Sequence, residues 1–109
     1  MSKLTELNTA INALNELWPL LDSGDKQRDE ILEERNKLNA QASELAHKTL
    51  LEGVPELNDA IEQLNLVTKA ANEAKESIDD VAKRINSVAD IIDKAVSAVG
   101  KVAALIAVL

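Results

Sequence analysis

The second half of the chain carries an apolar residue at every first and fourth position of a seven-residue repeat. These positions, a and d in alternation, are Leu57, Ala60, Leu64, Val67, Ala71, Ala74, Ile78, Val81, Ile85, Val88, Ile92, Ala95, Val99, Val102, Ile106 and Leu109. No proline interrupts the run. Because a helix turns once per 3.6 residues, such a repeat draws one apolar seam along a helix. The pattern predicts an all-α chain that folds so that this seam is covered.

The composition agrees with long helices and few turns. Among 109 residues there are 3 Gly and 2 Pro, 28 % of the residues are charged, and Trp18 is the only aromatic residue. A length of this order favours one domain. An aliphatic core with almost no aromatic bulk is typical of helices that pack closely along their length, and no strand signal is present.

The first half repeats apolar residues at spacings of three and four from Leu4 to Leu21, and Pro19 lies inside this run. Pro19 predicts a kink there, and the cluster Asp22–Asp25 predicts a turn or a new helix start near Lys26. The seven-residue frame nevertheless continues through this interruption to Leu45. It therefore favours a kinked but collinear first arm over a chain that turns back.

Gly53-Val54-Pro55 is the clearest turn, since Gly suits the end of a helix and Pro its first position. We therefore expect one helical domain over residues 1–109, with arm one at 1–52, the turn at 53–55 and arm two at 56–109. The arms would form an antiparallel hairpin about 75–80 Å long at ~1.5 Å per residue. If Pro19–Gly24 is a true reversal, a three-helix bundle is the alternative. Ser77-x-x-Asp80 is a capping pattern that would divide arm two, but the unbroken seam favours continuity.

The two halves also resemble each other. Residues 6–15 and 56–65, fifty positions apart, share Glu, Leu, Asn, Ala, Ile, Leu and Asn at matching places. The echo has two explanations, a duplicated helix or heptads of limited composition that converge.

Beyond residue 78 the apolar stripe widens, and the last eight residues, Val102–Leu109, carry no polar side chain. One partner arm covers only one side of such a helix. We expect the remainder to be covered by a second copy, so that two hairpins form a four-helix bundle as a dimer. The alternatives are another helical protein or a membrane. The predicted interface consists of Ile85, Val88, Ile92, Val96, Val99, Val102, Leu105, Ile106, Leu109 and Trp18. For Trp18, filling the seam at the kink is favoured over a role as a contact anchor.

Several functional classes lack support in the sequence. A net charge of −7 without a basic cluster argues against nucleic acid as a partner. The chain has no Cys, no nucleophile elbow and no Gly-rich phosphate loop. Glu44-x-x-His47 is the one metal-like motif, but His47 is the only His and the paired motif is missing. We therefore expect no catalysis, no metal and no cofactor.

Polar residues such as Lys3, Glu6 and Asn8 break up any apolar segment near the N-terminus. This predicts a cytoplasmic protein, or one exported without a cleavable signal peptide. In size and inferred shape the chain resembles small secreted helical-hairpin families with a Trp-x-Gly turn, although the turn here, Leu51-Glu52-Gly53, has no Trp.

The sequence thus predicts a non-enzymatic interaction or assembly protein that acts through coiled-coil-like packing of its C-terminal helix. The alternative is a membrane-active or pore-forming secreted component that inserts its apolar C-terminal segment.

Overall fold

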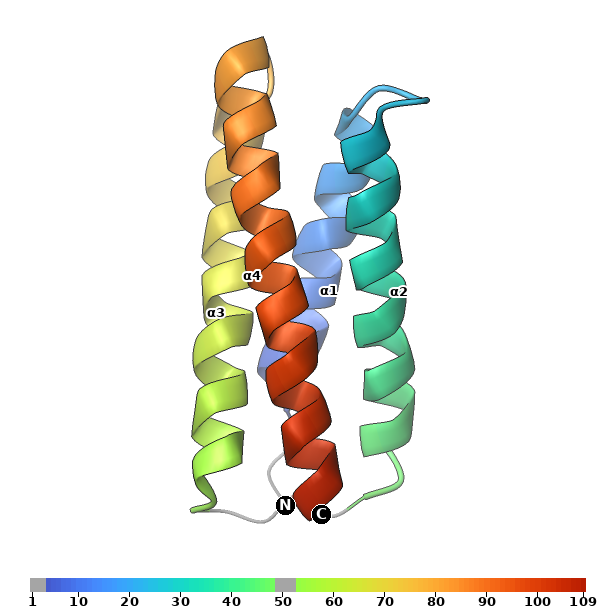
Figure 1. The fold of residues 1–109 in the computed structure, drawn as a ribbon, viewed down its shortest axis with the longest axis vertical. Helices are drawn as coiled ribbons and strands as arrows, with labels where there is room; N and C mark the ends of the chain where they lie inside the picture. Colours follow the sequence, from blue (N-terminus) through green and yellow to red (C-terminus); the bar gives the residue numbers. More distant parts are fainter. Residues whose placement is uncertain (1–3, 49–52) are drawn as a thin grey trace.

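The computed structural model describes residues 4–48 and 53–109, and this part of the chain contains helices and no strands. The elements are α1 (Thr5–Leu17), a short 3-10 helix η1 (Trp18–Leu20), α2 (Lys26–Leu45), α3 (Pro55–Glu76) and α4 (Val81–Val108). The all-α class and the helical bundle are confirmed (Figure 1).

The four helices stand at the corners of a square. Helix α1 is a neighbour of α2 and α3, and α4 is a neighbour of the same two helices, whereas in the diagonal pairs α1–α4 and α2–α3 no Cα atoms lie within 8 Å of each other. Helices α1 and α3 run in the same direction, as do α2 and α4 (Figure 1). The fold is thus two helical hairpins, α1–α2 and α3–α4, laid side by side in parallel.

The long hairpin was a wrong prediction. The described residues span 42 × 20 × 18 Å, about half the length that two uninterrupted arms would need. The four-helix bundle forms within one chain, because both arms turn back on themselves. The first reversal is the one that the three-helix alternative required, and a second one produces the fourth helix.

The first reversal follows from Pro19 and Gly24. Pro19 lies in the 3-10 turn η1, after which Leu21 is extended at φ −88° and ψ 149°. Gly24 has φ +90°, a left-handed conformation that glycine adopts without steric cost. Asp25 then caps α2, where its carboxylate accepts a hydrogen bond of 2.9 Å from the Gln27 backbone N–H.

The second reversal uses the capping pattern Ser77-x-x-Asp80, so the prediction that arm two is continuous was wrong. Ser77, at φ −111° and ψ 17°, ends α3. Asp80 caps α4 and accepts a hydrogen bond of 3.1 Å from the Lys83 backbone N–H. The apolar repeat runs through this turn in the same frame, so the repeat alone could not indicate the break. Folding back buries apolar side chains that an extended hairpin leaves in water, at roughly 25 cal/mol per Å².

The core runs along the axis of the square, and every helix contributes to it. Its large, fully buried side chains are Leu7, Leu14, Leu17, Ile31, Leu38, Leu64, Val67, Val88, Ile91, Val102 and Leu105. Helix α2 buries three apolar side chains and Glu34, whereas α1, α3 and α4 each bury six apolar side chains. Helix α2 is therefore the least apolar wall of the bundle.

Candidate interaction surface

Helix α4 places the d and g positions of its repeat, rather than a and d, in the core. The buried side chains are Val88, Ile91, Ala95, Ala98, Val102 and Leu105. The a positions Ile92, Val99 and Ile106 are partly buried at the edge of the core. A corner helix has two neighbours, so its buried arc is centred between them and is displaced from a two-helix seam.

The residues predicted as an interface therefore divide into three groups. Val88, Val102 and Leu105 are fully buried within the chain. Ile85 and Val96 are 48 % and 53 % exposed. The remaining members are partly buried and pack against the core, namely Ile92, Val99, Ile106, Leu109 and Trp18. Packing inside the chain thus uses most of the predicted set and leaves Ile85 and Val96 on the surface.

The outward face of α4 carries a row of exposed apolar or small residues that is interrupted by Asp93, and we name this row the outer stripe. Its members follow one another at helical spacings of three, four and seven, and they are Ala82, Ile85, Ala89, Val96, Gly100, Ala103 and Ala107. Asp93, four residues after Ala89, is the single charged residue in the row. The solvent side of a bundle helix ordinarily carries polar residues. An exposed apolar face of this kind is typical of an interaction site.

Gly100 lies in the C-terminal half of the outer stripe and inside α4. A Cβ atom built at this position would meet nothing within 4 Å, so no contact in the chain requires a glycine. Glycine inside a helix is less favourable than alanine by roughly 0.5–1 kcal/mol. The described fold offers no compensation for this cost, whereas a second helix that approaches the stripe closely would.

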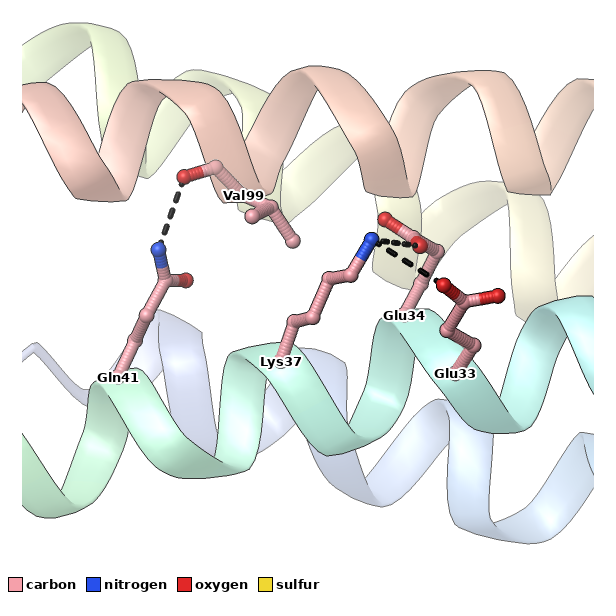
Figure 2. Close-up of polar contacts among 5 residues, drawn as sticks. All are labelled: Glu33, Glu34, Lys37, Gln41 and Val99. Atoms are coloured by element: carbon pink, nitrogen blue, oxygen red, sulfur yellow. Dashed lines mark hydrogen bonds and ion pairs between the residues drawn. The ribbon is translucent and has the colours of Figure 1, made fainter.

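A polar row on α2 faces α4 on the neighbouring side. The row consists of Gln27, Glu34 and Gln41, seven residues apart. The side-chain amide of Gln27 donates a hydrogen bond of 2.9 Å to the backbone carbonyl of Ile85. The side-chain amide of Gln41 donates one of the same length to the backbone carbonyl of Val99 (Figure 2). Both contacts join residues that are 58 positions apart in the sequence. Glu34, midway between Gln27 and Gln41, therefore lies at the height of Ile92 along the bundle axis. This row was not predicted from the sequence, although the seven-residue spacing of its polar residues is a visible signal.

Glu34 is 5 % exposed, and its carboxylate accepts a hydrogen bond from the Lys37 ammonium at 3.0 Å. The same ammonium lies 3.5 Å from the Glu33 carboxylate, so Lys37 reaches toward both carboxylates (Figure 2). The hydrogen bond with Glu34 and its negative charge, with a smaller effect of Glu33, raise the pKa of Lys37 above its ordinary value. The buried Gln41 Oε1 has no hydrogen-bond partner among the described residues.

Trp18 lies at the reversal between α1 and α2, where it is partly buried against the core. The Arg28 guanidinium lies 4.6 Å from the centre of its ring, a cation–π contact. Trp18 thus fills the kink between α1 and α2. Because it lies there, it does not serve as an exposed aromatic contact residue on the outer stripe.

Other parts of the described chain offer little chemistry. No group of three or more His, Asp or Glu residues suited to a metal occurs within residues 4–48 and 53–109, and His47 is exposed. A shallow hollow between α1 and α3 is lined by hydroxyls, amides and one carboxylate, from Thr9, Asn12, Ala13, Glu16, Thr68 and Asn72. Of the helices described, none has the length and apolar character needed to cross a membrane.

A scan against protein-family models gives no match, and searches of curated proteins and of solved structures give no significant match either. The functional argument therefore depends on the geometry of the bundle itself.

Proposed function

We propose that this protein is a non-enzymatic helical interaction or assembly protein that binds a partner helix along the outer stripe of α4. The observation that carries the proposal is the exposure of an apolar row on the solvent side of a bundle helix. From Ala82 to Ala107 the stripe runs about 37 Å at ~1.5 Å per residue, enough to seat five or more turns of a second helix.

The C-terminal helix remains the binding element, but the binding surface is its solvent side rather than the predicted seam. The seam that the sequence indicated on this helix is largely covered by α2 and α3, and a partner could reach Val88 or Val102 only by opening the core. The outer stripe requires no such opening. Its alanines and Gly100 allow two helix axes to come close, and Ile85 and Val96 supply the larger side chains that fill the gap.

Site-specific photo-crosslinking tests the proposal. A photoreactive amino acid replaces Val96 in one variant and Ser43, exposed on α2, in the control. Both proteins are irradiated in the source cells, and adducts are separated by mass and identified by mass spectrometry. We expect a polypeptide adduct from position 96 and none from position 43. Equal adducts from both positions, or none from either, would contradict an interaction site on the outer stripe.

The membrane-active alternative draws on the exposed end of α4, where Val108 is 45 % exposed. Insertion of the last eight residues would require Val102 and Leu105 to leave the core, which removes two fully buried side chains from the bundle. Flotation of the intact protein with vesicles of anionic or zwitterionic lipid tests this function. The bundle-interaction proposal expects the protein to stay with the unbound fraction on both.

A further inference from the structure

We propose that the occupant of the outer stripe is a second copy of this chain, with the two α4 helices antiparallel and Asp93 of each copy paired with Lys101 of the other. The inference rests on the proposed function and adds to it the partner, the direction of the helices and their register.

The first observation concerns two charged residues on α4. Asp90 and Lys94, one helical turn apart on α4, already form an ion pair of 2.6 Å. Asp93 and Lys101 have no ion-pair partner among the described residues. Around the axis of α4, Asp93 lies at the edge of the outer stripe and Lys101 lies beyond it, both toward the flank opposite α2. In an antiparallel pair related by a two-fold axis, the same flanks of the two helices meet, so the two-fold axis creates two identical Asp93–Lys101 pairs.

The second observation concerns the sizes of the side chains that would meet between the two α4 helices. With Asp93 opposite Lys101 of the second copy, Val96 falls between Val96 and Gly100 of that copy. Ala89 falls between Ala103 and Ala107 on the other helix. The missing side chain at Gly100 thus meets the largest side chain near the centre of the stripe. This position explains a helix-interior glycine that no contact within the chain requires.

Other arrangements fit less well. In a parallel pair, each residue lies at the height of its own equivalent, which sets Asp93 level with Asp93 and Lys101 level with Lys101. An antiparallel pair with complete overlap of the two helices sets Asp93 near Asp93 at the centre. Like charges that meet across an interface disfavour the complex, and opposite charges fix the register.

Charge reversal tests the pairing, with molar mass measured by light scattering across a dilution series. Asp93→Lys alone and Lys101→Asp alone each produce two like-charge contacts in a homodimer. We expect each variant to raise the dissociation constant by about tenfold or more. Mixing the two variants restores both opposite-charge pairs, so the mixture should associate as tightly as the original chain.

The matched control reverses two charges on another helix, α3, where Asp59 and Lys69 are exposed. Asp59→Lys and Lys69→Asp, alone or mixed, should leave the dissociation constant unchanged. A shift in the control equal to that of the α4 variants would show a net-charge effect and overturn the register.

Gly100→Leu separates association from folding. Because nothing lies within 4 Å of the added Cβ and leucine favours helix, the isolated monomer should melt at a higher temperature. The dimer should nevertheless dissociate more readily, since the added side chain occupies the space that Val96 of the second copy needs. A leucine variant that associates as tightly as the original chain would contradict the close approach.

The outcomes also separate this inference from the proposed function. A chain that stays monomeric at its highest soluble concentration overturns the second copy as the occupant. If position 96 then crosslinks to a different polypeptide, the interaction function stands and self-association is wrong. If position 96 yields no adduct, both are wrong.

Discussion

Replacing the buried carboxylate of Glu34 by leucine should stabilise the bundle. Glu34 is 5 % exposed at the contact between α2 and α4, and the equal offset of the flanking contacts sets it at the height of Ile92. A leucine side chain of similar length buries apolar surface there, worth roughly 1.5–3 kcal/mol. The change loses an ion pair with Lys37, whose side chain is half exposed, and such pairs are worth about 0–1 kcal/mol.

The expected result for Glu34→Leu is therefore a gain of about 1–2 kcal/mol in the free energy of unfolding. For a domain of this size, 1 kcal/mol corresponds to roughly 4–8 °C in melting temperature. Urea denaturation followed by circular dichroism measures the free energy, provided that the slope with denaturant is unchanged. The matched control is Glu33→Leu, one residue away and 65 % exposed, which should change stability by at most about 0.5 kcal/mol.

The reasoning fails if Glu34→Leu destabilises the protein by more than about 1 kcal/mol while Glu33→Leu is neutral. That result would mean that the Glu34–Lys37 interaction in the folded protein outweighs the cost of burying the carboxylate. The polar row would then be a net source of stability for the α2–α4 contact, rather than a device that fixes its register.

Three further predictions follow from single positions. Gly24→Ala should cost about 1 kcal/mol or more in stability, measured by urea denaturation, because φ +90° strains any side chain; an unchanged midpoint would contradict the turn geometry. Asp80→Ala should cost about 1 kcal/mol by removing the hydrogen bond to the Lys83 N–H, and Asp80→Asn should recover most of it. The raised pKa of Lys37 stabilises the fold fully below the ordinary lysine pKa of about 10.4, and this contribution is lost as pH rises through the raised value. Lys37→Met should therefore flatten the fall in stability above about pH 10, measured by denaturation at each pH, whereas an unchanged alkaline slope would contradict the pair.

Local signals in the sequence predicted much of the secondary structure. The seven-residue repeat indicated helices, Asp22–Asp25 indicated a start near Lys26, and Gly53-Val54-Pro55 indicated a start at Pro55; α2 and α3 begin at these residues. These features depend on backbone conformation and capping over a few residues. They hold whatever the rest of the chain does.

The number of helices and the inner face of α4 were harder to predict for one physical reason. The apolar repeat keeps the same frame across the reversals at Gly24 and Ser77-x-x-Asp80, so periodicity could not indicate that the chain turns back. Helix α4 is apolar over more than half of its circumference, and either the a/d or the d/g side could face inward. The choice depends on having two neighbours in a square, which is a property of the tertiary fold.

The distribution of apolar residues between α2 and α4 is a further reason to expect a partner. Helix α2 presents Gln27, Glu34 and Gln41 to the edge of α4 that carries the apolar residues Ile85, Ile92 and Val99. Helix α4 has apolar residues on its outward side as well, where solubility favours polar ones. A bundle that stays monomeric would be more stable if the exposed apolar residues of α4 were polar and the polar row of α2 were apolar. The exposed apolar residues of α4 instead form a row that includes Gly100, a glycine that no contact in the described fold requires, and this is the arrangement that the proposed second helix would use.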